Sequence, residues 1–323
     1  MSSNSQGEVI VADTLSVVVP VYNEEESLNK LYQAICENAA ALQQENRSGD
    51  FDIWFVDDGS SDKSLEVLKS LAEKDARCRV IVFRRNFGKA AALAAGFAHA
   101  QGDIMITMDA DFQDDPCDFR RFLDELDKGY DLVSGWKKVR NDPLEKRLPS
   151  KLFNKVTSML SGVKLHDFNC GFKAYRKAAA KSLNIYGEFH RYLPVMAARN
   201  GFRVGEITVI NHKREFGHSK YGWERYLRGL FDSVSASFLL RYSDRPMYLF
   251  GKFALCCGFL AVLLIAAGFF CCGFYGLLTW IAAMFCIVLA IGSFALGLIC
   301  NLIVDSLWKL SRREDHIKEI VEK

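Results

Sequence analysis

The sequence predicts an α/β domain with a mostly parallel sheet, followed by an interfacial helix and a two-helix transmembrane hairpin. The first observation is that short apolar, β-rich runs alternate with helical stretches between residues 15 and 136. Near-continuous apolar strands separated by helices are typical of a parallel sheet covered on both faces. The second observation is that residues 253–304 contain no Asp, Glu, Lys, Arg or His. A wholly soluble protein is therefore excluded.

The expected elements of the α/β domain follow one another in strict alternation. The strands are Leu15–Val19, Ile53–Val56, Val80–Phe83, Ile104–Met108 and Leu132–Ser134. The helices are Ser27–Gln44, Lys63–Asp75, Ala90–Ala100 and Cys117–Lys128. In an open parallel sheet, ligands bind outside the carboxyl ends of the strands. Residues that directly follow a strand are therefore the candidates for chemistry.

Four of these strand ends are followed by polar side chains. They are Tyr22, Asn23 and Glu24, then Asp57 and Asp58, then Asn86 to Lys89, and finally Asp109, Asp111 and Gln113. Neither a Walker loop nor a GxGxxG sequence follows any strand, so no glycine loop is present to hold phosphates. Bare carboxylates would repel a nucleotide, and the acidic edge is therefore expected to carry a divalent cation.

The pair Asp109 and Asp111 forms a DxD sequence, which alone is a weak signal because Asp50-Phe51-Asp52 is another. Position separates the two. Asp50 precedes an expected strand, whereas Asp109 and Asp111 directly follow one, at the ligand edge. Side chains alternate in direction along an extended chain, so both carboxylates point to one side. We expect this pair to bind a metal ion.

The charge-free block has the length of two membrane helices. A bilayer core needs about 20 helical residues, so 52 residues are too many for one span and too few for three. A turn is expected at 273–279. Basic residues precede the block at Arg241, Arg245 and Lys252 and follow it at Lys309, Arg312 and Arg313. By the positive-inside rule, both flanks are expected in the cytoplasm, as is the N-terminal domain, which has no signal-peptide pattern.

Five segments are expected along the chain. They are a polar tail at 1–14, the α/β domain at 15–220, an interfacial amphipathic helix at 221–247, two transmembrane helices at 248–304 and a cytosolic tail at 305–323. The interfacial helix is inferred from apolar residues at helical spacing with charges between them. An ordinary helix packed on the α/β domain remains the alternative.

The charge balance excludes one class of partner. Lys and Arg total 41 against 39 Asp and Glu, a net charge of +2, and the two signs are interspersed. A nucleic-acid-binding module would carry a concentrated basic field. Nucleic acid is therefore not expected as a partner.

Six ordered motifs between residues 15 and 225 carry a family resemblance. They are VPVYNE at 19–24, VDDGS at 56–60, NFGK at 86–89, DADFQDDP at 109–116, DFNCGFKAYR at 167–176 and REFGHSK at 214–220. With these motifs the chain resembles the inverting family 2 glycosyltransferases of the GT-A fold, which is Rossmann-like. Within them it is similar to the group of bactoprenol glucosyltransferases and dolichyl-phosphate mannosyltransferases, and the two-span tail matches the bactoprenol branch.

The resemblance implies a donor site for a nucleotide sugar. The residues implied for the nucleoside and diphosphate are Pro20, Tyr22, Asn23, Glu24, Asp58, Lys89 and Arg176, and those implied for Mg²⁺ or Mn²⁺ are Asp109, Asp111 and Gln113. Arg214, Ser219 and Lys220 resemble the family's loop that closes over the diphosphate. Structural alternatives without ligand contact stay open. Pro20 and Tyr22 could merely shape the end of the strand, Asp57 could cap the following helix, and the basic loop could be solvated.

The acceptor implied by the resemblance is a polyprenyl phosphate. A phosphate monoester has a second pKa of about 6, so it is already an anionic nucleophile at neutral pH and needs no strong base. It does need cations to position it, and the family pattern suggests Arg147, Lys173 and Arg176. Lys173 departs from the arginine common in this motif, which puts a bidentate contact in doubt. Asp167 either orients the acceptor or acts as a modest base.

The expected function is inverting transfer of a monosaccharide, with UDP-glucose as first choice, to undecaprenyl phosphate at the cytoplasmic face of the inner membrane, for modification of a cell-envelope glycan. Mannose from GDP-mannose, N-acetylhexosamine and aminoarabinose are alternative sugars. A processive polysaccharide synthase is disfavoured because no QxxRW sequence is present, and a non-catalytic binding module because the carboxylates and the loop are retained. The resemblance also implies a homo-oligomer, and a separate flippase and periplasmic transferase, because a helical hairpin is too small to transport the product.

Overall fold

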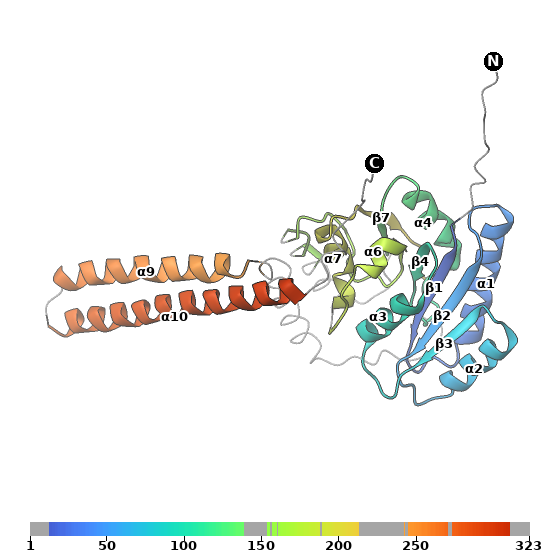
Figure 1. Ribbon diagram of the computed structural model, residues 1–323, viewed down its shortest axis with the longest axis horizontal. Helices are drawn as coiled ribbons and strands as arrows, with labels where there is room; N and C mark the ends of the chain where they lie inside the picture. The colour runs from blue at the N-terminus through green and yellow to red at the C-terminus, as the bar shows by residue number, and fades with distance from the viewer. Residues whose placement is uncertain are drawn as a thin grey trace, which may run out of the picture. The chain divides into compact units, whose positions relative to one another are not determined.

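The computed structural model describes residues 13–138, 154–155, 157–159, 161–187, 189–212, 242, 245–270 and 273–310 (Figure 1). The chain divides into two compact units, 1–233 and 234–323. The first contains the α/β domain and the second contains two long helices, and each is described by itself.

The described part of the first unit is built on one seven-stranded sheet, in the order β3-β2-β1-β4-β6-β5-β7. The strands are β1 (Leu15–Val21), β2 (Phe51–Asp57), β3 (Cys78–Val82), β4 (Ile104–Thr107), β5 (Leu132–Trp136), β6 (Lys173–Arg176) and β7 (Val204–Thr208). Strands β1 to β4 pair in parallel, β6 runs antiparallel to both neighbours, and β5 pairs in parallel with β7. The expected mostly parallel sheet is confirmed, with one reversed strand, β6, between β4 and β5.

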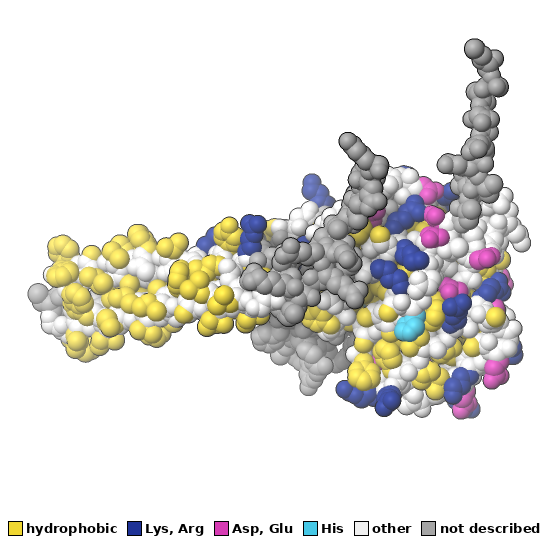
Figure 2. Space-filling model, in the orientation of Figure 1, with side chains coloured by type: hydrophobic (Ala, Val, Ile, Leu, Met, Phe, Trp, Pro, Cys, Tyr) yellow, Lys and Arg dark blue, Asp and Glu magenta, His cyan; other side chains and the backbone are white. Residues whose placement is uncertain are grey.

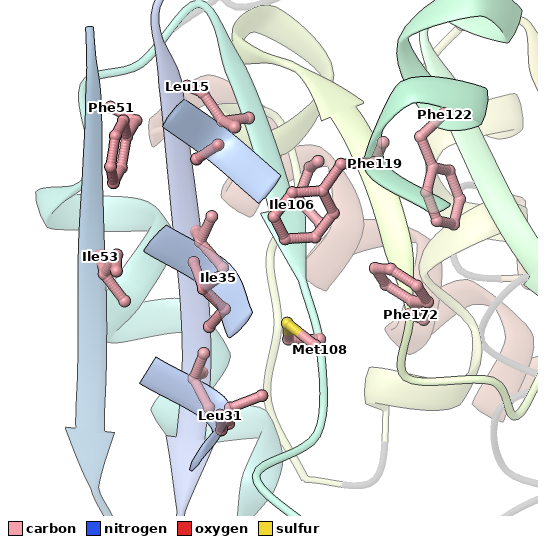
Figure 3. Packing of buried hydrophobic residues seen from close by; sticks show 14 of the residues in the cluster. Leu15, Leu31, Ile35, Phe51, Ile53, Ile106, Met108, Phe119, Phe122 and Phe172 are labelled. Atoms are coloured by element: carbon pink, nitrogen blue, oxygen red, sulfur yellow. The ribbon is translucent and has the colours of Figure 1, made fainter. Parts of the chain in front are cut away.

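Helices cover both faces of this sheet. Their bounds are α1 (Leu28–Gln44), α2 (Ser64–Lys74), α3 (Lys89–His99), α4 (Phe119–Leu126), α6 (Lys177–Lys181) and α7 (Leu193–Arg199), with 3-10 turns η1 (Pro116–Asp118) and η2 (Phe189–Arg191). On one face, Leu31 and Ile35 of α1 and Phe122 of α4 pack with Ile106 and Phe172 (Figure 3). A second buried cluster joins α3, α6 and α7 to the opposite face.

Alternation along β1 shows why the two faces separate. Val17 and Val19 belong to the cluster under α1, whereas Val18 belongs to the cluster under α3. Successive side chains of a strand point to opposite faces, so a strand buried on both sides must be apolar at every position. Pro20 is tolerated in this central strand because β4 pairs with β1 only through residue 18.

The nine expected elements are all present, with ends that differ by at most two residues. The last expected helix is divided, because Asp115 accepts a hydrogen bond from the Cys117 N–H at 3.0 Å and Pro116 opens the short turn η1 before α4 begins. Strands β6 and β7 and helices α6 and α7 lie beyond the region in which alternation was recognised.

The second unit contains α9 (Met247–Phe270) and α10 (Phe274–Leu310), packed as an antiparallel hairpin. By length and composition, both are apolar enough to cross a membrane. Hydrophobic side chains cover much of the visible surface of the hairpin (Figure 2). Of the turn expected at 273–279, Gly273 lies before α10 with a left-handed φ of 71°, whereas 274–279 belong to the first turns of α10.

Small residues allow the two long helices to approach each other. A Cβ atom on Gly297 would lie 2.8 Å from the Met247 Sδ and 2.9 Å from the Phe250 Cβ. One turn earlier, the Ser293 hydroxyl donates to the Phe250 carbonyl oxygen at 3.0 Å. Close approach through small residues is a common way for helices to associate in lipid.

Helix α3 packs closely on the sheet at Gly96, because a Cβ atom there would lie 2.3 Å from the Val18 Cγ1. We expect Gly96→Ala to lower the free energy of unfolding of the α/β domain by about 1–3 kcal/mol through overpacking. Thermal unfolding followed by tryptophan fluorescence measures the change. Ala98→Ser, on the exposed side of the same helix, is the control, and equal midpoints for the two variants would contradict this packing.

Candidate active site

The carboxyl end of β1 is fixed to the turn that follows β2. The Asn23 N–H donates to the Ser60 Oγ at 3.0 Å, and the Asn23 Oδ1 accepts from the Ser61 N–H at 2.7 Å. The Glu24 N–H donates to the Ser64 Oγ at 2.8 Å. Asn23 has a left-handed φ of 55°, a conformation that asparagine tolerates better than most residues. The structure therefore brings the first two predicted segments together at one edge.

Asp58 holds a third segment at this edge. Its carboxylate accepts the Phe87 N–H at 2.7 Å and the Gly88 N–H at 2.9 Å, directly before α3. Burial raises the pKa of Asp58 despite these two hydrogen bonds, which act in the opposite direction. Asp58 thus anchors the loop that carries Lys89. Its contact with a nucleoside stays a prediction.

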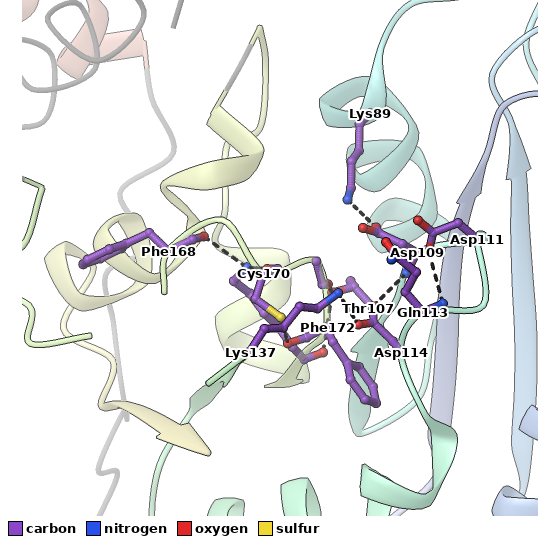
Figure 4. A network of polar contacts seen from close by, with 12 residues as sticks. Lys89, Thr107, Asp109, Asp111, Gln113, Asp114, Lys137, Phe168, Cys170 and Phe172 are labelled. Carbon is purple, nitrogen blue, oxygen red and sulfur yellow. Dashed lines mark hydrogen bonds and ion pairs between the residues drawn. The ribbon is translucent and has the colours of Figure 1, made fainter. Parts of the chain in front are cut away.

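Asp109 lies between a cation and a glycine. Its Oδ1 forms an ion pair with the Lys89 Nζ (Figure 4). On another side, a Cβ atom on Gly171 would lie 2.5 Å from the same Oδ1, so only glycine leaves room for the carboxylate. Burial opposes ionisation of Asp109, but the attraction of Lys89 and Lys137 outweighs it and lowers the pKa of Asp109 to about 2. Asp109 is therefore ionised at neutral pH.

The loop after Asp109 is held from within the domain. Asp114, whose side chain is buried, forms an ion pair with Lys137 at 2.6 Å. The Ser27 hydroxyl donates to the Ala110 carbonyl oxygen at 2.7 Å, and the Gln113 N–H donates to the Asp111 Oδ1 at 3.3 Å. Asp109, Asp111 and Gln113 therefore lie in one restrained loop, as the sequence predicts (Figure 4).

Asp167 and Lys173 lie beside this loop on the side of β6. The Asp167 N–H donates at 3.0 Å to the carboxylate of Glu206 on β7, which also accepts the His166 N–H at 2.8 Å. Lys173 is fully buried, and its ammonium donates to the Cys170 and Phe168 carbonyl oxygens. Burial lowers the pKa of Lys173. Lys173 therefore holds the backbone of the 168–172 segment through these two carbonyl oxygens.

Arg176 does not belong to this edge, and its assignment to the ligand site is corrected. Strand β6 runs antiparallel, with Lys173 beside Thr107 and Arg176 beside Ile104 at the opposite end of β4. There the Arg176 guanidinium pairs with Asp13, and with Asp127 at 3.5 Å. In a reversed strand, three residues carry the chain about 10 Å away from the ligand edge.

Four predicted site residues lie outside the described residues. They are Arg147, Arg214, Ser219 and Lys220. The expected interfacial helix at 221–247 is outside them almost entirely. These assignments stay predictions.

Several residues at the site were not singled out from the sequence. Lys137 directly follows β5, so the strand-end rule could have found it, whereas Glu206 lies within β7 and gives no such signal. His190 in η2 is another. Burial and the nearby Lys89 lower its pKa to about 3, so its imidazole is neutral at pH 7.

Comparison with known families identifies the family of this domain. A family model described as Glycosyl transferase family 2 matches residues 16–183. The chain belongs to this family. The matched segment contains β1 to β4, Asp109 and Gly171, so the Asp109 loop lies within the family 2 domain.

Two similar proteins act on lipid carriers according to their names. The dodecaprenyl-phosphate galacturonate synthase of Rhizobium johnstonii is 38% identical over 256 residues, which cover 78% of this chain and 74% of that protein. The undecaprenyl-phosphate 4-deoxy-4-formamido-L-arabinose transferase of Pseudomonas aeruginosa is also 38% identical, over 78% of this chain and 73% of that protein.

A solved structure shows the same fold. The glucosyl-3-phosphoglycerate synthase of Mycobacterium tuberculosis, in complex with Mn²⁺ and UDP-glucose, aligns with a TM-score of 0.51 and 19% identity over 71% of this chain and 79% of that chain. The expected GT-A fold of this family 2 glycosyltransferase is thereby confirmed.

The residues present fit a hard divalent cation. Asp109, Asp111 and Gln113 offer carboxylate and amide oxygens, the ligands that Mg²⁺ and Mn²⁺ prefer. The Lys89 ammonium already places one positive charge against Asp109. Within the described ranges, no group of three His, Cys, Asp or Glu could hold a metal ion alone. Phosphate oxygens and water would have to complete the coordination, as is usual for Mg²⁺.

Gly171 provides a test of this geometry. Gly171→Ala adds a methyl group where the Asp109 carboxylate lies, while the backbone φ of Gly171 is not left-handed and adds no strain. We expect kcat/KM for sugar transfer to fall by about 10- to 100-fold, as for other displacements of roughly 1 Å. The Mn²⁺ concentration for half-maximal activity should rise at an unchanged unfolding temperature. Unchanged activity at limiting Mn²⁺ would contradict the close approach.

Proposed function

We propose that this glycosyltransferase moves a monosaccharide from a nucleotide sugar to a polyprenyl phosphate, with inversion at the anomeric carbon. The observation that carries the proposal is the Asp109 loop at the carboxyl end of β4, which presents oxygen ligands and Lys89 at one edge. Support for the lipid acceptor comes from the names of the two bacterial relatives and from the two apolar helices.

The donor side would be formed by the edge residues of β1, β2 and β4. Asp109, Asp111 and Gln113 would hold Mg²⁺ or Mn²⁺, which when bound neutralises charge on the departing diphosphate. Lys89, at the start of α3, adds a second positive charge beside the same oxygens. Tyr22, which is 39% exposed, would lie against a nucleobase. Asp58 contributes mainly by fixing the Lys89 loop.

The acceptor phosphate would enter on the β6 side. Because the phosphate is already anionic at pH 7, the chain has to orient it rather than deprotonate it. Lys173 contributes positive potential but holds its ammonium against carbonyl oxygens, so direct contact with the acceptor phosphate would fall to Arg147, while Arg214, Ser219 and Lys220 would close over the donor diphosphate. Asp167, fixed through its backbone by Glu206, would orient the acceptor.

The sugar is the finer part of the proposal. UDP-glucose is the first choice from the sequence, and the names of the relatives add galacturonate and 4-deoxy-4-formamido-L-arabinose. We further infer that both ends of the hairpin face the cytoplasm, since basic residues flank it and its turn is uncharged. The catalytic unit would then work at the inner face of the cytoplasmic membrane, and a flippase would have to move the product.

The metal requirement is tested with Asp111→Asn. We expect transfer to undecaprenyl phosphate to fall by about 10²- to 10³-fold, the usual loss when one group that stabilises developing charge is removed. The matched control is Asp50→Asn in the other DxD sequence, because Asp50 is exposed, lies before β2 and accepts a hydrogen bond from the Gln43 amide at 3.2 Å. Full activity of Asp111→Asn in excess chelator would refute the metal role.

The stereochemistry is tested on the lipid product. Incubating the full chain in detergent with undecaprenyl phosphate and, in separate reactions, UDP-glucose, UDP-galacturonate and the UDP-linked formamidoarabinose identifies the donor. We expect one of these to give a glycosyl phospholipid whose NMR coupling shows the anomeric configuration opposite to that of the donor. A product that retains the donor configuration would exclude single displacement by the phosphate.

A further inference from the structure

The Lys89–Asp109 ion pair places an internal cation where a metal ligand is expected. Lys89 is the first residue of α3, and its ammonium contacts the Asp109 Oδ1. The two side chains are 31% and 33% exposed, so the pair lies at the mouth of the site and not in the core. A lysine ammonium and an aspartate carboxylate that form such an ion pair are both charged at neutral pH.

The surroundings of the pair limit what can move. The Gly88 N–H is bound by Asp58 at 2.9 Å, which fixes the backbone directly before Lys89. Gly171 packs against the Asp109 carboxylate, and the Asp109 N–H lies 3.4 Å from the Asp114 Oδ2. The carboxylate and the helix start are therefore restrained, whereas the Lys89 side chain has four rotatable bonds and reaches solvent. If the pair opens, Lys89 is the part that leaves.

A dication arriving alone at Asp109 would meet this ammonium. Like charges a few ångströms apart at a partly exposed site repel strongly, so Lys89 weakens binding of a bare metal ion. A diphosphate changes the balance, because its anionic oxygens provide Lys89 with a new partner and the metal with further ligands. Binding of the metal and binding of the diphosphate therefore strengthen each other.

We propose that Lys89 is a built-in counter-cation that occupies Asp109 until a metal–diphosphate complex displaces it, so that metal and nucleotide bind interdependently. The inference rests on the proposed nucleotide-sugar donor. By linkage, any factor by which the nucleotide tightens metal binding equals the factor by which the metal tightens nucleotide binding. The chain would hold little metal between turnovers and would release it with the nucleoside diphosphate.

The test measures Mn²⁺ binding rather than activity. Free Mn²⁺ is followed by electron paramagnetic resonance during titration of the full chain in detergent, with and without UDP. For the unaltered chain, we expect UDP to lower the Mn²⁺ dissociation constant at least tenfold. For Lys89→Met, we expect Mn²⁺ alone to bind at least tenfold more tightly than to the unaltered chain, and the effect of UDP to shrink to less than threefold.

Three further variants make the result specific. Lys89→Arg keeps the charge and should bind Mn²⁺ alone as weakly as the unaltered chain. Lys177→Met removes a lysine that follows the far end of β6, where its ammonium donates to the Gln101 carbonyl oxygen at 2.8 Å, and should change neither constant. Lys89→Met combined with Asp111→Asn should lose the gain, which places the extra Mn²⁺ at this loop.

The two proposals fail in different ways. If Mn²⁺ alone binds Lys89→Met no better than the unaltered chain, the counter-cation role of Lys89 is wrong, whatever UDP does. If Lys89→Met gains Mn²⁺ affinity but neither UDP nor GDP alters Mn²⁺ binding to any variant, the counter-cation role stands and the nucleotide-sugar donor is wrong.

Discussion

The carboxylate of Asp109 is restrained from three directions, and the chemistry assigned to this chain depends on that restraint. Lys89 compensates its charge, Gly171 packs against it without a side chain, and the Asp114–Lys137 pair holds the loop behind it. Each neighbour comes from a different part of the sheet, since Lys89 follows β3, Lys137 follows β5 and Gly171 precedes β6. Folding of the whole domain is therefore needed to form the site.

The buried Asp114–Lys137 pair has a desolvation cost for the stability of the domain. Removing two charges from water is unfavourable, and a buried ion pair often adds no net stability compared with apolar residues. Loss of one partner would nevertheless leave an uncompensated charge inside the domain, so the pair favours one position of the loop over others. The apolar clusters on the two faces of the sheet supply the stability that such a polar interior requires.

Strand-end reasoning predicted much of this site because it follows from parallel topology. It found Asn23, Asp58 and Asp109, which the structure brings to one edge. The family pattern, in contrast, misplaced Arg176, since a sequence does not reveal that β6 is reversed, and in a reversed strand the first residue lies at the ligand edge and the last at the other. Glu206 was missed because a polar residue within a short strand has no positional signal until its neighbours are known. In the second unit, α10 begins directly after Gly273, earlier than composition could show.

The central claim is that the edge formed by Asp109, Asp111 and Gln113 holds a divalent cation together with a nucleoside diphosphate. Anomalous diffraction at the manganese edge, from crystals of the full chain grown with Mn²⁺ and UDP, measures it directly. The account predicts one peak within coordination distance of the Asp109 and Asp111 carboxylates and of diphosphate oxygens, with the Lys89 ammonium moved from Asp109 to the diphosphate. A diphosphate bound elsewhere, or a Mn²⁺ peak away from this loop, would contradict it.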